Sequence, residues 1–351
     1  MSRKRLVFIT NIPNQYRIPL FNELHHQLLD RGIEFHVIFG ALCYNKRKTI
    51  IDLSDCQFEY TILESKLFNG IEKNTGFIFY CGLMRVVKSL NPSEIIVTGY
   101  ALSTMKLLIF NKFKPNVYYI FSGSTLPLNS KPNFFRDFQR KILVKKAKGF
   151  VAYSTVAKNY LIELGGKAST ITVMGNTVDT SFFKNETEKL RSEVKESGTK
   201  HLLYIGYINP RKKVEELVYV VKQLVKLRTD FVLDIIGDGE NVDSLLELIR
   251  SNKLENYFNL HGFKQKEELP NYLAQSQCFL FQTSFDIWGL VLNEAMAAGL
   301  PCLASINAGA TEDLIKEGIT GFKVNFKNHK YVAEKIDYLL NNPIESKKIG
   351  Q

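Results

Sequence analysis

Two carboxylates lie eight positions apart in a segment whose residue types suit sugar and phosphate binding. Asp286 precedes Trp288-Gly289-Leu290, and Glu294 follows them. The apolar run before this segment predicts a strand and the run after it predicts a helix, so we expect Asp286 in the connecting loop. Amides at a helix start bind anions such as phosphate, and a carboxylate accepts hydrogen bonds from paired sugar hydroxyls. The alternative is that Asp286 only caps the helix and Glu294 lies on its solvated face.

Common nucleotide and metal motifs are absent from the sequence. Gly237-Asp238-Gly239 lacks the third glycine of a dinucleotide-binding loop, and Gly166-Lys167 lacks the earlier glycine of a P-loop. No Asp-x-Asp triplet, His-Glu-x-x-His motif or spaced histidine cluster occurs. NAD-dependent oxidoreductase and P-loop kinase chemistry are therefore disfavoured, and we predict neither a metal site nor a cofactor.

The elements that must position these residues follow an alternating pattern of short strands and helices. In the first half we expect a helix at Ile18–Leu29 and strands at Leu6–Thr10, Glu34–Phe39, Glu94–Thr98, Val117–Phe121 and Gly149–Tyr153. In the second half we expect strands at His201–Ile205, Phe231–Ile236, Phe258–His261, Cys278–Gln282 and Pro301–Ala304. The helices between them are expected at Val214–Leu227, Asn241–Ser251, Lys266–Ala274 and Leu292–Ala298. Such alternation is typical of α/β folds with parallel sheets.

The chain length and the pattern predict two Rossmann-like domains. We place the first at residues 1–180 and the second at 181–351, with a linker in the charged, apolar-poor stretch Asp179–Lys200. Ligands of open α/β sheets bind beyond the carboxyl ends of the strands. Two such sheets facing each other would therefore place an active site in the cleft between the domains.

The segment from Ser284 to Pro301 resembles the signature of the retaining glycosyltransferases of family 4, which have the GT-B fold. That signature is an acid, seven residues and a second acid within a pattern like E-x-F/W-G-L-x-x-x-E-A-M-A-x-G-x-P. Asp286 and Glu294 match the two acids, Trp288, Gly289 and Leu290 match the central triplet, and Glu294 to Pro301 match throughout. The departure is Asp for Glu at position 286, which keeps the charge and shortens the reach.

The resemblance extends to a diphosphate-binding element at the start of the second domain. The family's G-R-x-x-x-x-K element is similar to Gly206-Tyr207-Ile208-Asn209-Pro210-Arg211-Lys212. Lys212 fits the lysine, Tyr207 stands where the arginine usually is, and Arg211 offers the missing cation from nearby. The alternative is a solvated helix start. Gly237 belongs to a strand-turn that resembles another family element, for which a plain turn and a donor-binding role stay equally open.

The first domain resembles the family less closely. Its first loop contains Asn11, Tyr16 and Arg17, in a variant associated with members that build bacterial surface polysaccharides. Ser122 occupies the place where an acceptor-side histidine often follows a strand. These four residues are our candidates for the acceptor side. Family members normally continue into a last helix that crosses back onto the first domain, so the closing helix is expected to be truncated or abbreviated here.

The resemblance implies a metal-independent, retaining transferase. Glu294 would hold the nucleotide ribose, Asp286 would contact donor-sugar hydroxyls, and Lys212 with Arg211 would neutralise the leaving diphosphate. Gly206, Gly237, Trp288, Gly289 and Leu290 would complete the donor site. The donor would be a UDP- or GDP-linked sugar, and the acceptor a saccharide or lipid-linked hydroxyl in capsule, O-antigen or lipopolysaccharide synthesis.

Composition and charge indicate where the chain is located and what kind of partner it binds. Apolar residues make up 45% of the 351-residue chain, no apolar run is long enough for a membrane span, and the N-terminal run is too short for a signal peptide. The five cysteines form no CxxC pair, which disfavours disulfides and zinc. We therefore expect a cytoplasmic chain. Residues 1–180 hold 24 Lys and Arg against 12 Asp and Glu, whereas the remainder holds 22 against 23, so an anionic partner is expected for the first half.

A basic amphipathic helix is predicted between Phe134 and Gly149. Its basic residues are expected to dock on an anionic membrane surface, at the inner face of the plasma membrane, because basic-apolar helices lie at interfaces; they are Arg136, Arg140, Lys141, Lys145 and Lys146. An ordinary surface helix is the plainer alternative, and nucleic acid is the least favoured partner. A second class of function also stays open, a non-catalytic scaffold of the same fold that uses the basic first half.

Overall fold

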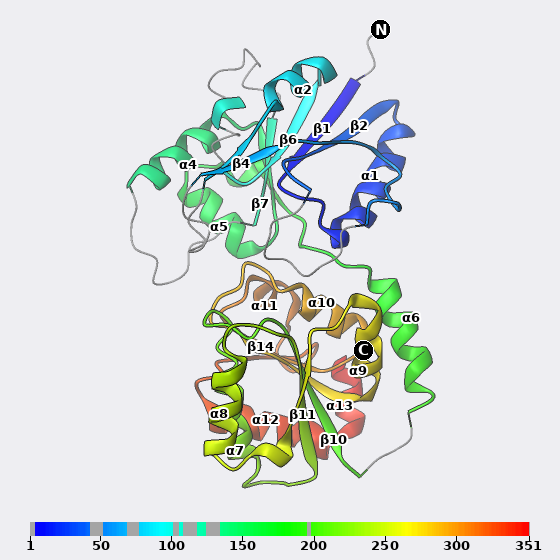
Figure 1. Cartoon of the computed structure of the whole chain (residues 1–351), viewed down its shortest axis with the longest axis vertical. Coiled ribbons are helices and arrows are strands. Elements are labelled where there is room, and N and C mark those ends of the chain that lie inside the picture. The colour runs from blue at the N-terminus through cyan, green and yellow to red at the C-terminus, as the bar shows by residue number, and fades with distance from the viewer. Residues whose placement is uncertain are drawn as a thin grey trace. The chain divides into compact units, whose positions relative to one another are not determined.

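The computed structural model describes residues 4–42, 52–68, 77–100, 105–107, 118–123, 134–194 and 198–350. The chain divides into two compact units, Met1–Thr177 and Val178–Gln351 (Figure 1). The division lies three residues before the boundary expected after residue 180.

The first unit is built on a parallel sheet in the order β3-β2-β1-β6-β7-β8-β9. Its strands are β1 (Lys4–Thr10), β2 (Ile33–Phe39), β3 (Glu59–Ile62), β6 (Glu94–Thr98), β7 (Tyr118–Ser122), β8 (Gly149–Ala152) and β9 (Ile171–Val173). A separate antiparallel pair joins β4 (Ser65–Phe68) to β5 (Phe77–Tyr80). The five expected strands are present, whereas β3, β9 and this pair were not expected because they are short.

Helices cover both faces of the first sheet. They are α1 (Ile18–Leu29), α2 (Leu83–Leu90), α4 (Phe134–Lys146) and α5 (Thr155–Glu163), with single turns η1 (Gln15–Arg17) and η4 (Ala168–Thr170). Successive side chains of a strand point to opposite faces. Accordingly, Val7 and Ile9 of β1 join the core beneath α2, α4 and α5, whereas Phe8 packs against Phe21 of α1, with ring centroids 4.9 Å apart.

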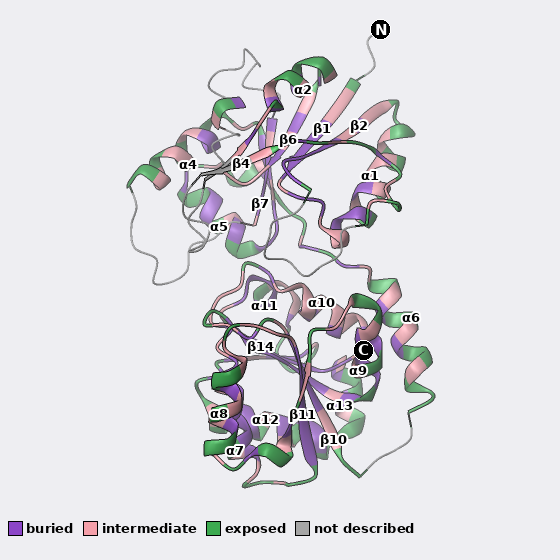
Figure 2. Cartoon of the chain, viewed as in Figure 1, coloured by how far each residue is buried: buried purple, intermediate pink, exposed green. Residues whose placement is uncertain are grey.

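The second unit repeats this plan with six parallel strands in the order β12-β11-β10-β13-β14-β15. They are β10 (Lys200–Ile205), β11 (Phe231–Ile236), β12 (Phe258–Gly262), β13 (Ser276–Phe281), β14 (Cys302–Ser305) and β15 (Phe322–Val324). The strands are buried and the outer helix faces are exposed (Figure 2). Strand β11 is buried along its whole length, as expected for a parallel strand covered on both faces.

The helices of the second unit complete two layers around the sheet. They are α6 (Thr180–Arg191), α7 (Glu215–Leu224), α8 (Val242–Ser251), α9 (Leu269–Gln275), α10 (Leu290–Ala297), α11 (Gly309–Leu314), α12 (His329–Asn341) and α13 (Pro343–Gly350), with single turns η5 (Glu255–Tyr257) and η6 (Lys266–Glu268). Helices α7, α8 and α12 bury their apolar sides in one continuous core against the strands. The fold of two Rossmann-like α/β domains predicted from the sequence is therefore confirmed.

One expectation was wrong: the stretch placed as a linker begins with helix α6. Asp179 caps this helix by accepting a hydrogen bond from the Phe182 amide at 3.0 Å. Phe183 and Thr187, one turn apart, form its buried side, and α6 packs against α9 and α10. A helix that buries so few side chains has a weak apolar periodicity. The charged sequence of this stretch therefore did not predict a helix.

Candidate functional site

Two loops of the second unit meet at the carboxyl edge of its sheet. One follows β10 and the other follows β13, and these adjacent strands mark the point where the strand order reverses. The crevice beyond such a switch point is the usual ligand site of a doubly wound sheet. The sequence candidates Gly206, Arg211 and Lys212 lie on the first loop, and Asp286 lies on the second.

Hydrogen bonds hold the two loops together. The Lys212 amide donates to the carbonyl and the side-chain oxygen of Asn209, both at 3.0 Å, which closes a turn. The amide and hydroxyl of Ser284 donate to the Arg211 carbonyl at 3.1 and 2.6 Å, and Gln282 Nε2 donates to the Lys213 carbonyl at 3.1 Å. The side chains of the two loops are therefore fixed relative to each other.

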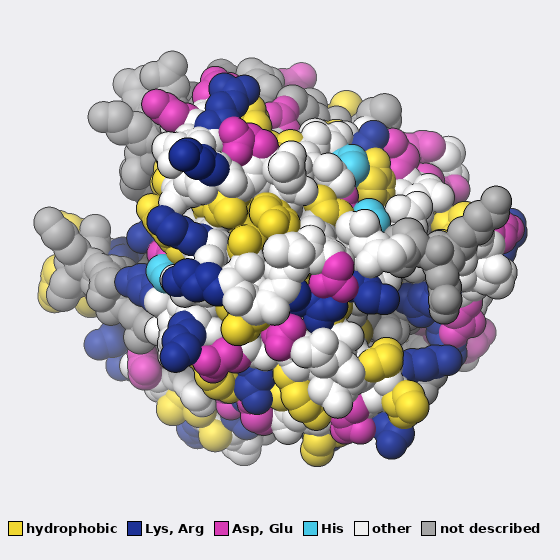
Figure 3. Space-filling view, turned by 90° about the horizontal axis from the view of Figure 1, so that it is seen from below, with side chains coloured by type: hydrophobic (Ala, Val, Ile, Leu, Met, Phe, Trp, Pro, Cys, Tyr) yellow, Lys and Arg dark blue, Asp and Glu magenta, His cyan; other side chains and the backbone are white. Residues whose placement is uncertain are grey.

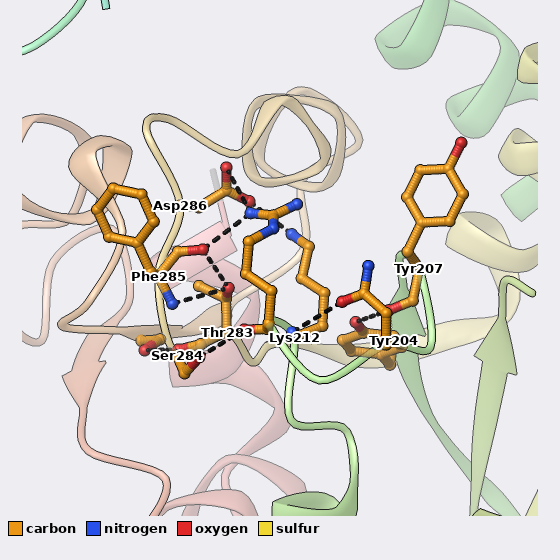
Figure 4. Close-up of polar contacts among 10 residues, drawn as sticks. Tyr204, Tyr207, Lys212, Thr283, Ser284, Phe285 and Asp286 are labelled. Atoms are coloured by element: carbon orange, nitrogen blue, oxygen red, sulfur yellow. Dashed lines mark hydrogen bonds and ion pairs between the residues drawn. The ribbon is translucent and has the colours of Figure 1, made fainter. Parts of the chain in front are cut away.

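These loops bring two cations to one carboxylate, shown in Figure 4. Lys212 Nζ lies 2.5 Å from Asp286 Oδ2, and Arg211 Nη1 lies 3.4 Å from Asp286 Oδ1. Arg211 Nη1 also donates to the Phe285 carbonyl at 2.8 Å. Lys212 is only 6% exposed, whereas the Arg211 side chain is 46% exposed. Burial lowers the pKa of Lys212, and the Asp286 charge opposes that shift. The alternative in which Asp286 caps the following helix is excluded, because Gly289 is the N-cap of α10 and has no side chain.

Glu294 on α10 has a different environment. Its Oε2 atom is buried and accepts no hydrogen bond from the described residues. Burial raises the pKa of this carboxyl from 4.5 to about 7, and Lys266 opposes the shift. The alternative that placed Glu294 on a solvated helix face is therefore wrong. The side chain as a whole is half-buried, but a buried carboxyl oxygen without a partner is costly, and a ligand hydroxyl that donates to Oε2 would remove the cost.

The glycines and the tryptophan of the candidate donor site have clear packing roles. Gly237 has a φ of 152°, and a Cβ there would lie 1.9 Å from the Gly206 carbonyl oxygen, so these loops approach by their backbones. Gly289 has a φ of 104°, and its Cβ would lie 2.0 Å from the Phe281 ring. Trp288 is buried, and its Nε1 donates to Asn293 Oδ1 at 2.7 Å. Leu290 is the first residue of α10. Their part in donor binding stays a prediction. Tyr207, in the place of the family's arginine, points away from the ion group (Figure 4).

A third segment at this site was missed by the sequence reasoning. The Asp286 amide donates to the Asn307 carbonyl at 3.1 Å, and the Gly309 amide donates to the Asp286 carbonyl at 3.1 Å. The loop between β14 and α11 therefore holds the backbone of the catalytic candidate. The run of small residues Ala308-Gly309-Ala310 shortly after a strand was the signal that would have identified it.

The acceptor-side candidates gather at the carboxyl edge of the first sheet. Arg17 precedes α1 and is 7% exposed, and Ser122 ends β7 and is 1% exposed. Asn11 follows β1, and its Oδ1 accepts from the Thr10 hydroxyl at 3.3 Å. The Tyr16 ring centroid lies 5.5 Å from the Arg17 Cζ.

Helix α4 confirms that the basic stretch is helical, and its cations fall into two groups. Arg136 pairs with Asp137 at 2.9 Å, and Arg140 donates to the Tyr160 hydroxyl at 2.6 Å. Lys141, Lys145 and Lys146 are exposed. Three aromatic side chains on the same helix are also exposed: Phe134 at 76%, Phe135 at 82% and Phe138 at 54%.

The described residues contain neither a helix that could span a membrane nor a cluster of metal-binding side chains. None of the helices among them is long and apolar enough to cross a membrane. Among the same residues no group of three or more His, Cys, Asp and Glu side chains lies close enough to hold a metal ion. On the face seen in Figure 3, basic and acidic side chains are interspersed.

Comparison with known proteins places this site in context. Residues 185–351 match the family described as Glycosyl transferases group 1. The chain is 26% identical over 339 residues to the N-acetyl-alpha-D-glucosaminyl L-malate synthase of Bacillus anthracis, covering 94% of this chain and 85% of that protein. Among solved structures it is similar to Anabaena HepE in complex with UDP and glucose, with a TM-score of 0.71 and 18% identity over 99% of this chain and 92% of that one. It is also similar to the lipopolysaccharide outer core galactosyltransferase WaaB, with a TM-score of 0.69 and 17% identity over 97% and 91% of the two chains.

Proposed function

Residues 185–351 belong to the group 1 glycosyl transferases, and on this premise we propose that the chain transfers a sugar, with retention, from a UDP- or GDP-linked donor to a hydroxyl group. The acceptor is a saccharide or a lipid-linked saccharide of bacterial capsule, O-antigen or lipopolysaccharide synthesis. The observation that carries the proposal is the ion group of Lys212, Arg211 and Asp286 at the switch point of the second sheet.

The leaving group sets the main electrostatic demand of the reaction. Glycosyl transfer passes through an oxocarbenium-like transition state while negative charge grows on the departing nucleoside diphosphate. Lys212 and Arg211 supply preorganised positive charge, and the amides from Trp288 to Leu290 at the start of α10 add donors. Because Lys212 is buried, its charge is weakly screened by water.

The two carboxylates bind different parts of the donor. Glu294 accepts hydrogen bonds from the nucleotide ribose, which satisfies its buried Oε2. Asp286 accepts from hydroxyls of the donor sugar while it orients both cations. Asp286 is engaged by two cations and Glu294 is partly protonated at neutral pH, so neither carboxylate suits the role of nucleophile. Attack of the acceptor hydroxyl on the same face as the leaving phosphate, with that phosphate as base, is consistent with this arrangement.

Protein cations in place of a metal make transfer independent of divalent ions. Excess EDTA should leave the rate unchanged. Complete loss of activity on chelation, restored by manganese or magnesium, would contradict this part of the proposal.

Membrane association of helix α4 is the second part of the proposal, with localisation at the cytoplasmic face of the plasma membrane. Exposed Lys141, Lys145 and Lys146 suit anionic headgroups, and the three exposed phenylalanines suit insertion at the interface. Arg136 and Arg140 contribute less than the sequence suggested, because both have protein partners. Changing the three lysines to Gln should abolish binding to anionic vesicles without changing nucleotide affinity. Equal binding to neutral vesicles would refute the docking.

A thermal-shift panel tests the transferase proposal. A ligand that binds the folded chain raises its melting temperature, so UDP or GDP should raise it while CMP does not. The product of a successful reaction should keep the anomeric configuration of the donor, as read by NMR. No shift with any nucleoside diphosphate would overturn the proposal.

A further inference from the structure

A buried guanidinium at the carboxyl edge of the first sheet has no acidic partner among the described residues. Arg17 is 7% exposed. It donates from Nη1 to the Thr10 hydroxyl at 3.0 Å and from Nη2 to the Tyr153 hydroxyl. Both acceptors are neutral. The Nε atom is buried and has no hydrogen-bond partner among the described residues.

Aromatic rings enclose this charge. The Arg17 Cζ lies 5.5 Å from the ring centroid of Tyr16 and 5.6 Å from those of Phe121 and Tyr153. The rings of Phe121 and Tyr153 also pack edge to face, 4.7 Å apart. Cation–π contacts favour a guanidinium, but they supply no hydrogen-bond acceptor, and among the described residues only two of its five N–H donors have one.

The position of Arg17 at the start of a helix makes an uncompensated positive charge there still less favourable. Arg17 is the N-cap of α1, a twelve-residue helix, and the N-terminal end of a helix carries partial positive charge. A second positive charge at this position is unfavourable by itself. A buried charge without a counter-ion is also costly, so the arrangement is complete only when an anion is present.

The position of the cluster is that of a ligand site. Thr10 ends β1, Phe121 and Ser122 end β7, and Tyr153 follows β8. These strands all belong to the parallel sheet of the first unit, whose carboxyl edge is where doubly wound folds bind ligands.

From these observations we infer that the acceptor carries an anionic oxygen group, a carboxylate or a phosphate, and that Arg17 binds it. That the bound anion belongs to the acceptor depends on the proposed function. The anion site itself depends only on the structure of the first unit. Two planar N–H donors match the paired oxygens of either group. An acidic sugar and a phosphate next to a sugar are the two sources of this chemistry.

Direct binding to the whole chain tests the inference without requiring the true acceptor. The probes are glucuronic acid for the carboxylate, glucose 6-phosphate for the phosphate, and glucose as the uncharged control. Wild type should bind at least one anionic probe at least tenfold more tightly than glucose. Arg17→Gln should remove this preference, and Arg17→Lys should keep part of it because the charge remains but the planar fork is lost. Arg31→Gln, the same change at an exposed arginine of the same unit, should behave as wild type.

The anionic probe that binds more tightly shows whether the acceptor group is a carboxylate or a phosphate. A preference for either probe over glucose supports the anion site at Arg17. Equal affinity for glucose and both anions in wild type, or an anion preference that persists in Arg17→Gln, would overturn it. If Arg17→Gln does not fold, the Nε–H NMR signal of Arg17 in wild type, assigned by its absence in Arg17→Lys, replaces it. That signal should shift on titration with the anionic probe and stay in place with glucose; a signal that does not respond to the anion overturns the site.

The nucleotide panel separates this inference from the proposed function. Nucleoside diphosphate binding without anion binding at Arg17 leaves the transferase proposal standing and removes the anionic acceptor. Anion binding at Arg17 without any nucleotide binding supports the anion site and removes the transferase proposal.

Discussion

The two units share one strand order and differ in the charges at their carboxyl edges. Each sheet runs 3-2-1-4-5-6 when its own strands are counted in chain order, with one further strand in the first unit. At the edge of the second sheet, Lys212 and Arg211 share the carboxylate of Asp286. At the edge of the first, the partners of Arg17 among the described residues are hydroxyl acceptors and aromatic rings.

On this difference we base the proposal that the two edges bind two kinds of ligand. In the second unit a diphosphate would compete with Asp286 for the two cations, because this carboxylate offsets part of their charge. In the first unit the proposed anionic ligand would neutralise the charge of Arg17. Ligand specificity therefore comes from the loops after the strands, while the shared sheet supplies their positions.

The largest expected effect is on turnover, from Lys212→Ala. Removing one preorganised donor to developing charge lowers kcat by roughly 10²-fold or more. Steady-state kinetics at saturating donor measures it. Lys330→Ala, at a lysine whose side chain is 81% exposed, is the matched control and should not change the rate. Unchanged turnover in Lys212→Ala would remove the lysine from the donor site.

Glu294→Gln should weaken nucleotide binding and change its pH dependence. A hydrogen bond to a charged group contributes about 1.5 to 3 kcal/mol, so affinity for the nucleotide should fall roughly tenfold to a hundredfold. Burial raises the pKa of Glu294 to about 7, and the ionised form is the better acceptor. Affinity of wild type should therefore increase between pH 6 and 8.

The pH profile is measured with a nucleotide sugar, because its diphosphate has no proton that titrates near neutrality. Glu294→Gln should give a flat profile in the same calorimetric titration. A wild-type affinity that does not change with pH would argue against the ribose contact.

Asp286 variants should separate transfer from nucleotide binding. Asp286→Asn should damage transfer but should not weaken binding of the free nucleoside diphosphate, because it removes a competitor for Lys212. Asp286→Glu, which restores the family's usual residue, should be tolerated. Parallel kinetics and calorimetry on both variants test this, and loss of nucleotide affinity in Asp286→Asn would reverse the assigned roles.

The smallest effect is on stability, at the hydrogen bonds that two half-buried histidines make to the buried Asp234. Asp234 is 5% exposed and bonds to His201 and His261, each at 2.7 Å. Asp234→Asn should lower the free energy of unfolding by about 1 to 3 kcal/mol. Nucleotide affinity should stay the same, which distinguishes this change from those at the site.

The stability loss should depend on pH. The bond to Asp234 raises the pKa of His201, so its contribution is full below 6.5 and is lost as pH rises through the raised value. Burial by itself raises the pKa of Asp234, but hydrogen bonds from His201, His261 and Asn259 together outweigh it and lower the pKa. The contribution of Asp234 is therefore full above 3.8 and is lost as pH falls through the lowered value. The difference between wild type and Asp234→Asn should be largest between about pH 4 and 6.5, as measured by urea unfolding. An equal difference at pH 8.5 would contradict it.

The sequence predicted the elements with strong periodicity and missed those with weak periodicity. Strands Glu94–Thr98 and Phe231–Ile236 and helix Ile18–Leu29 have the predicted bounds, because each has a clear apolar pattern between turn residues. Helix α6 was missed because few of its side chains are buried.

The sequence predicted which residues form the candidate site, but it did not predict the contacts between them. Lys212, Arg211 and Asp286 were each identified, but their mutual ion pairing depends on the adjacency of β10 and β13, which motif spacing does not specify. The same holds for Arg17 and Tyr153, which are 136 positions apart in the chain. The unpartnered oxygen of Glu294 depends on the packing around α10, which sequence patterns do not describe.

Calorimetric titration of one nucleotide sugar into three variants tests the division between the units most directly. Lys212→Ala and Glu294→Gln, in the second unit, should each weaken binding by tenfold or more, whereas Arg17→Gln, in the first, should bind the donor as wild type does. If neither second-unit variant weakens binding, the segment from Ser284 to Pro301 is only a packed strand, loop and helix, and a non-catalytic scaffold becomes the better account. If Arg17→Gln weakens donor binding as much as Lys212→Ala, the two edges do not serve separate ligands.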